Sequence, residues 1–228
     1  MKEREIKKRL QRLLKEKDLE YILRELRAVA PRNLVASLLS SLYQTDERIK
    51  WNAVTVIGEI MNDIARVDME AARVVMRRIL WSLNEESGGI GWGMPEAMGE
   101  IMAVNGRLAG EYAHLLVSYM REENYLELPA LQHGLLWGIG RLAMVRPELL
   151  LKNDADGHMV MYLESADQVA AGLACRNFGL LHVQEAAYQI RHFLDSPHVL
   201  ALYEDRRLFS TTVGALARQA LQRLGVCA

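Results

Sequence analysis

The sequence has little that predicts β-structure. Val, Ile and Thr do not alternate with polar residues over strand-length runs, so we expect no sheet. Proline is also scarce, with only 5 residues in 228, and most of these lie where helices are predicted to begin or end. The plentiful residues are Leu, Ala, Met, Arg and Glu, which favour helix. These features together predict an all-α protein.

Cysteine, net charge and long apolar runs are lacking as well. The two cysteines cannot form a disulfide framework, and Cys175 lies within an apolar helical stretch where a small core residue is expected. The formal net charge of −1 gives no attractive field for nucleic acid, so a nucleic-acid partner is not favoured. No stretch has the pattern of a signal peptide or the length of a membrane span. The expected compartment is the cytoplasm.

Known catalytic and metal-binding motifs are missing too. None of the 6 histidines belongs to an H-E-x-x-H motif or to a Cys/His zinc spacing. The chain contains no G-x-S-x-G nucleophile motif. We therefore expect no metal and no cofactor, and the sequence favours a protein that is not an enzyme.

What the sequence does have is a glycine that recurs at intervals of 41, 41, 39 and 46 residues. An apolar residue directly precedes each of these glycines, and another stands five residues before it. Glycine inside a helix costs about 1 kcal/mol relative to Ala, so its return predicts that a neighbouring helix packs closely there. The recurring residues are Gly58, Gly99, Gly140, Gly179 and Gly225.

The segment 49–58 resembles the second helix of a HEAT repeat, in particular the short HEAT-like repeats named after phycobilisome lyases. That helix reads roughly Val-Arg-x-x-Ala-x-x-Ala-Leu-Gly, and its Arg survives here only as Lys50. The resemblance implies an α-solenoid of about five helical hairpins over residues 31–225. Residues 1–30 would form N-terminal capping helices, and the whole chain, 1–228, would be a single domain.

Apolar spacing and the glycine register place the helices of each hairpin. First helices are expected at 32–43, 69–84, 107–122, 156–164 and 183–194. Second helices are expected at 47–64, 94–104, 130–145, 167–181 and 207–224. The last glycine interval is the longest, which predicts an insertion near residues 196–198.

One face of the second helices is rich in Trp and charge. Positions seven before, three before and one after each glycine are four residues apart and therefore share a helix face. In a solenoid the second helices line the concave side, so we interpret this face as an exposed binding groove. Its residues are Trp51, Trp92, Glu96, Glu100, His133, Trp137, Arg141 and Arg176.

The same residues admit a structural interpretation. Glu100 then pairs with Arg141, and the Trp side chains fill gaps between helices. The groove interpretation expects Trp92→Ala and Trp137→Ala to leave the fold intact. If either variant instead loses more than about 3 kcal/mol in free energy of unfolding, the replaced Trp is a core residue.

The groove favours a non-enzymatic scaffold that binds a protein or peptide, with a small ligand as a lesser possibility. A second hypothesis is a DNA glycosylase or other nucleotide-handling enzyme. The chain is similar to compact HEAT-like DNA glycosylases in its length and in its concave Trp and Arg residues. Glu59, Glu96 and Glu100 give half of the groove the wrong charge for a DNA duplex. A third hypothesis, a bilin-lyase-like role, is implied only by the name of the repeat.

Overall fold

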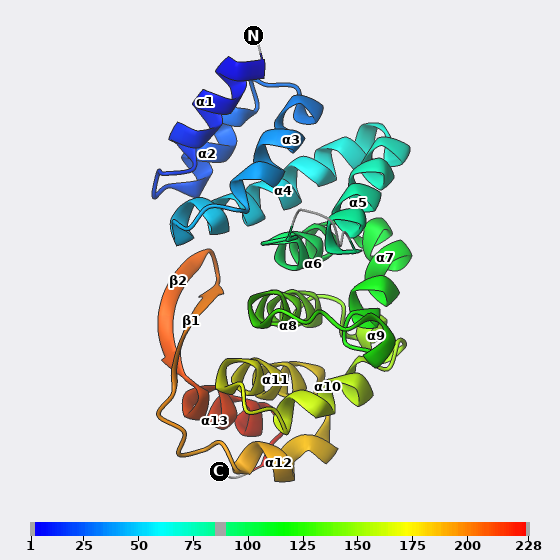
Figure 1. Ribbon diagram of the computed structural model, residues 1–228, viewed down its shortest axis with the longest axis vertical. Coiled ribbons are helices and arrows are strands. Elements are labelled where there is room, and N and C mark those ends of the chain that lie inside the picture. The colour runs from blue at the N-terminus through cyan, green and yellow to red at the C-terminus, as the bar shows by residue number, and fades with distance from the viewer. Residues whose placement is uncertain (1–2, 85–89, 227–228) are drawn as a thin grey trace. The chain divides into compact units, whose positions relative to one another are not determined.

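The computed structural model describes residues 3–84 and 90–226, and helices dominate this part of the chain (Figure 1). It contains thirteen α-helices and one two-stranded sheet. The all-α expectation is confirmed apart from that sheet. The chain separates into two compact units, residues 1–108 and 109–228.

Unit 1 is built around one long helix. Helix α4 packs against α3, α5 and α6. The described helices of this unit are α1 (Glu3–Leu13), α2 (Leu19–Leu26), α3 (Pro31–Ser41), α4 (Glu47–Val67), α5 (Met69–Asn84) and α6 (Met94–Val104). Helices α1 and α2 occupy the predicted N-terminal capping region, and α1 packs on α3.

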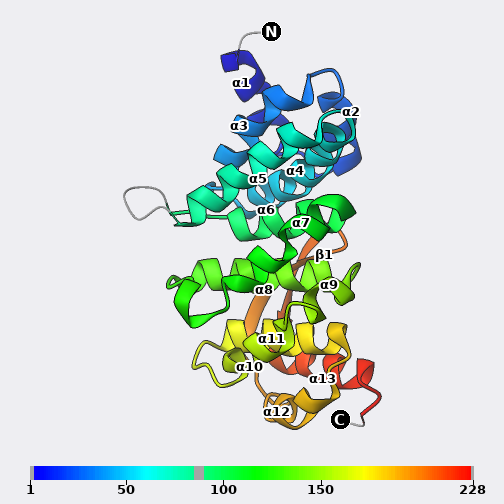
Figure 2. The same cartoon turned by 90° about the vertical axis from the view of Figure 1, so that its right-hand side faces the viewer.

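Unit 2 is centred on α11 (Gln168–Leu181), which lies between α8 (Pro129–Ala143) and α13 (Val213–Arg223) (Figures 1 and 2). Helix α7 (Gly106–Ser118) contains the boundary between the units. The remaining elements are η1 (Glu122–Asn124), α9 (Pro147–Leu151), α10 (Ala155–Leu163), η2 (Gln184–Ala186), α12 (Ala187–Arg191), β1 (Val199–Glu204) and β2 (Arg207–Thr212).

Local sequence signals account for many of the helix starts. The side chains of Asp46 and Asp167 accept hydrogen bonds from backbone N–H groups in the first turns of α4 and α11. Proline stands in the first turn of α3, α6, α8 and α9, where its missing N–H is not needed. The predicted second helices agree with α4, α6, α8 and α11 to within a few residues.

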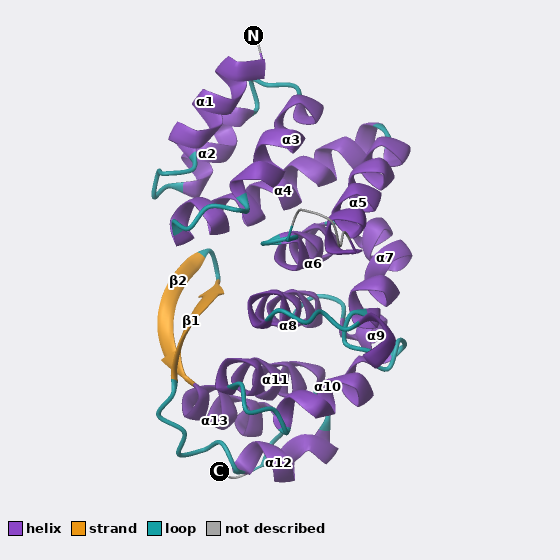
Figure 3. Ribbon diagram, in the orientation of Figure 1, coloured by secondary structure: helices purple, strands orange, loops and turns teal. Residues whose placement is uncertain are grey.

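The fifth predicted second helix, 207–224, is wrong in its first part. Residues 207–212 form β2, which pairs antiparallel with β1, and the helix begins only at Val213 (Figure 3). This hairpin is the insertion that the long glycine interval predicts. Its turn residues Asp205 and Arg206 both have positive φ, 49° and 61°. Arginine is a rare choice there, so the sequence carries no Asn-Gly type of signal for the turn.

The recurring glycines mark close helix contacts at three positions. A Cβ added to Gly58 would lie 2.8 Å from Cγ of Glu100 in α6, and one added to Gly179 would lie 2.6 Å from Cα of Ala220 in α13. A Cβ on Gly140 would collide with side chains of α11. The expectation is wrong for Gly225, which follows α13 with φ of 70° and has nothing within 4 Å of an added Cβ. Gly225 ends its helix in the left-handed conformation.

Gly179→Ala is expected to lower the free energy of unfolding by about 1–3 kcal/mol, because backbone atoms of α13 occupy the space of the new methyl group. Gly110 in α7 is the matched control, since nothing lies within 4 Å of its added Cβ. Gly110→Ala should raise stability by up to about 1 kcal/mol through helix propensity. Denaturant unfolding measures both changes, and equal stabilisation by the two variants would refute the close contact.

Candidate functional site

The predicted site residues of unit 1 are largely buried. Trp51, Glu96 and Glu100 are all buried, and only Trp92 is half-buried. Trp51 lies on α4, and Glu96 and Glu100 lie on α6, which packs on α4. The expectation that this face exposes its aromatic and charged side chains is therefore wrong in unit 1.

A buried ion pair explains part of this burial. Nζ of Lys50 lies 2.9 Å from Oε1 of Glu96 and 5.1 Å from the ring centroid of Trp51, whose Nε1 donates to Glu47. Burial lowers the pKa of Lys50, but the attraction of Glu96 and Glu47 outweighs it, so the pKa is raised above 10.5. Oε2 of Glu96 is buried and has no hydrogen-bond partner among the described residues. Lys50 is thus the charge that makes the burial of Glu96 possible.

Trp92 lies between Gly91 and Gly93 in the loop directly before α6. Gly93 caps this helix with φ of 74°, and a Cβ there would lie 2.8 Å from Cβ of Leu42. Only glycine suits both the conformation and the space.

In unit 2, the predicted residues His133 and Arg141 are half-buried. Nε2 of His133 lies 2.7 Å from Oδ2 of Asp167, the residue that caps α11. Burial alone would raise the pKa of Asp167. Hydrogen bonds from backbone N–H groups and from His133 outweigh burial, so the pKa lies below its ordinary value. His133 therefore ties α8 to the start of α11.

Trp137 and Arg176 are buried beneath strand β1. The indole Nε1 of Trp137 donates to the backbone carbonyl of Tyr203 at 2.7 Å, and Nε of Arg176 donates to Oε2 of Glu204 at 2.9 Å. Figures 1 and 2 both show the hairpin alongside α8 and α11. Burial and the nearby Arg223 and Arg141 lower the pKa of Arg176, against the opposing effect of Glu204.

The open groove expected in unit 2 is therefore wrong at Trp137 and Arg176. The chain's own hairpin covers these side chains and supplies the carbonyl and the carboxylate that they need when buried. No periodicity on the second helices could indicate this cover, because it comes from the inserted segment.

The hairpin itself is a feature that sequence analysis missed. Leu202 pairs with Phe209 and Glu204 with Arg207, and Val213 N donates to His198 O. In an antiparallel ladder, pairs that exchange backbone hydrogen bonds alternate with pairs that do not. Leu208 and Ser210 belong to the second kind, so their N–H and C=O groups point away from β1. No described residue bonds them, and 207–210 is exposed. Unit 2 thus presents an open strand edge.

A second missed feature is Trp81 on α5. Its side chain is 72% exposed, far more than any other tryptophan. The buried stripe of α5 is Ala72, Met76 and Ile79, and Trp81 lies off that stripe. This helical spacing was visible in the sequence and would have identified Trp81 as an exposed residue.

The described residues hold little that favours covalent or metal chemistry. Burial raises the pKa of the Cys175 thiol to about 12, so this cysteine is an inert core residue. Within residues 3–84 and 90–226, no three His, Cys, Asp or Glu side chains are grouped as metal ligands. In the same residues, no helix combines the length and hydropathy needed to cross a bilayer.

Comparison with known proteins gives the fold but not a family. No model of a known protein family matches the chain. An uncharacterised protein of Archaeoglobus fulgidus is 29% identical over 114 residues, which are 48% of this chain and 54% of that relative. The chain thus spans about half the length of the curated relative that it matches.

Two solved structures of engineered proteins are similar over nearly the whole chain. One, an engineered protein of the Northeast Structural Genomics Consortium, has a TM-score of 0.54 at 15% identity, with 97% of this chain and 96% of that chain covered. A designed armadillo repeat protein has a TM-score of 0.52 at 17% identity, with 95% and 98% covered. These similarities establish a helical-repeat fold.

Proposed function

We propose that this protein is a non-enzymatic binding scaffold, and that the open edge of β2 binds an extended segment of a partner protein. The single observation that carries the proposal is this edge, whose outward N–H and C=O groups have no partner among the described residues. Besides water, the group that matches such a row of alternating donors and acceptors is another backbone in extended conformation.

The side chains of β2 support a polypeptide partner. Leu208 and Phe209 are exposed apolar residues, and no proline or lysine protects the strand. Arg207 is exposed and has no ion pair among the described residues. An acidic residue at the matching end of the partner strand would complement this charge.

The predicted groove residues take a different role in this proposal. Trp137 and Arg176 hold β1 against α8 and α11, so that β2 is presented on a rigid support. A pre-ordered strand lowers the entropy cost of adding another strand to it. The helical-repeat fold of the designed neighbours is compatible with a scaffold but does not identify its partner.

The DNA glycosylase hypothesis gains no support from these contacts. It requires Trp137 and Arg176 to reach a nucleotide, whereas both are engaged by β1. The bilin-lyase hypothesis likewise has no observation in its favour among the described residues.

Ser210→Pro tests the edge directly. Peptides of about eight residues, a typical strand length, are selected on the full chain from a random displayed library, and their affinities are measured by calorimetry. Ser210→Pro removes one outward N–H group and leaves the internal hydrogen bonds of the hairpin in place. The expected loss of affinity is up to about tenfold, as for one hydrogen bond.

Ser210→Ala is the matched control, because it keeps the N–H group and should bind like the unmodified chain. The indole N–H resonance of Trp137 reports whether the hairpin remains docked in both variants. Failure to select any peptide, or equal affinity for the Ala and Pro variants, refutes the proposal.

A further inference from the structure

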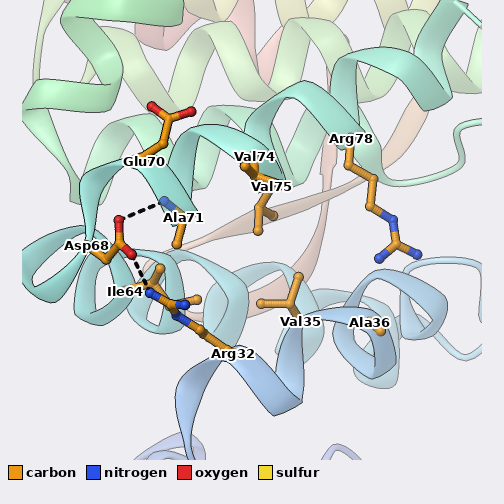
Figure 4. Close-up of a pocket in the computed structure, with 10 residues that line it drawn as sticks. All are labelled: Arg32, Val35, Ala36, Ile64, Asp68, Glu70, Ala71, Val74, Val75 and Arg78. Atoms are coloured by element: carbon orange, nitrogen blue, oxygen red, sulfur yellow. Dashed lines mark hydrogen bonds and ion pairs between the residues drawn. The ribbon is translucent and has the colours of Figure 1, made fainter.

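A second candidate surface lies in unit 1, between the first helices α3 and α5 (Figure 4). Helices α3 and α5 each pack on α4 but leave a groove of about 490 Å³ between them. Its apolar lining comes from all three helices: Val35 and Ala36 of α3, Ile64 of α4, and Ala71, Val74 and Val75 of α5.

The groove is shallow rather than enclosed. Val74 lines it and is still 54% exposed, so a small molecule would remain largely in contact with water. Small-ligand sites bury most of their ligand, which this groove does not do. A long apolar depression between two helices instead fits the apolar face of a third helix.

Charge differs between the two ends of the groove. At one end, Nη2 of Arg32 lies 2.5 Å from Oδ2 of Asp68, so these two opposite charges form an ion pair. Glu70 is paired with Arg77 and Arg73 on its own helix. At the other end, Arg78 points across the groove toward α3 and has no ion pair among the described residues (Figure 4). Of the charged residues that line the groove, Arg78 is therefore the one without an ion pair among the described residues.

Trp81 extends the same side of α5. Val74, Arg78 and Trp81 are spaced i, i+4 and i+7, so they form one stripe along the helix. Exposed Trp and Arg side chains are the residue types that most often anchor protein interfaces. The stripe places both beside the apolar lining, at the Arg78 end of the groove.

We infer that the α3–α5 groove is a docking site for an amphipathic helix of a partner protein, with a carboxylate of that helix at Arg78. The apolar face of the partner lies on Val35, Val74 and Val75, and Trp81 closes over its acidic end. This site is independent of the β2 edge in unit 2, so either proposal can fail without the other.

The test uses two synthetic helical peptides of about 18 residues, five helical turns, with Leu at i, i+3, i+4 and i+7. One carries Glu and the other Lys at the same end. Binding to the full chain is measured by fluorescence anisotropy of labelled peptide. The Glu peptide should bind about fivefold more tightly than the Lys peptide, the factor given by one exposed ion pair of about 1 kcal/mol. Arg78→Glu should reverse this preference.

Val74→Asp places a charge in the apolar lining and should lower the affinity for the Glu peptide by about tenfold or more. Val67→Asp is the matched control, because Val67 is 90% exposed and does not line the groove. Thermal unfolding by circular dichroism verifies that both variants fold. A blue shift of tryptophan emission on binding, absent in Trp81→Phe, places the peptide beside Trp81.

Three outcomes overturn the inference. The first is no binding of either peptide to the unmodified chain. The second is binding that is the same in Val74→Asp and Val67→Asp. The third is a self-associated chain in sedimentation that becomes monomeric in Val74→Asp, which makes a second copy of this chain the occupant.

Discussion

Replacing Trp137 with Ala is expected to lower the free energy of unfolding by about 3–5 kcal/mol. The side chain is only 5% exposed, packs beside Tyr203 with ring centroids 6.2 Å apart, and donates a hydrogen bond to the carbonyl of that residue. Its removal leaves a cavity between α8 and β1 and an unpaired carbonyl. This result would reverse the sequence-based expectation that Trp137→Ala leaves the fold intact.

Trp81→Ala is the matched control, since the same side chain is removed from a position that is 72% exposed. Its expected effect on the free energy of unfolding is within about 0.5 kcal/mol. Urea unfolding followed by circular dichroism measures both variants. Comparable losses at the two positions, or a loss below about 1 kcal/mol for Trp137→Ala, would contradict the assignment of Trp137 to the core.

The second large effect is expected for Lys50→Met. Glu96 is almost fully buried, and among the described residues Lys50 is its ion-pair partner. Removing one partner of a buried pair leaves an uncompensated charge, which costs about 3–5 kcal/mol. Lys17→Met, at an exposed position of unit 1, should change stability by less than about 0.5 kcal/mol.

The double variant Lys50→Met, Glu96→Met separates lost charge compensation from lost packing. It should recover most of the loss, because two apolar side chains of similar volume replace the pair. The pH dependence has a defined sign. Because the pKa of Lys50 is raised above 10.5, its contribution is fully present below that pH and is lost as the pH rises through the raised value. A double variant as unstable as Lys50→Met would show that packing rather than charge dominates.

The sequence was sufficient for the positions of most helices. Apolar spacing places α5 at 69–84, and the proline and aspartate residues at helix starts set the beginnings of α4, α6 and α11. These signals are local, because capping and amphipathic spacing act within a few residues of the chain. The recurring glycine also predicts the close approach at Gly58 and Gly179, since its cost within a helix requires a packing reason.

The candidate site was predicted only in part. Shared helix faces correctly group Trp137 with Arg141 on α8 and Glu96 with Glu100 on α6. Which of these side chains meet solvent does not follow from the face. The expected exposed groove is wrong at the buried residues Trp51, Glu96, Glu100, Trp137 and Arg176. The β1–β2 hairpin escaped prediction because its turn, Asp205–Arg206, has no glycine and its strands have no clear alternation.

The sequence by itself thus determined a helical-repeat protein, the register of most helices and the set of residues on each helix face. The tertiary structure alone decided that β1 covers Trp137 and Arg176, that Lys50 reaches Glu96, and that α3 and α5 leave an open groove. The physical reason is that secondary structure depends on contacts a few residues apart. Burial of a side chain depends on segments distant in the sequence, such as the hairpin that follows Arg176 by 23 residues or more.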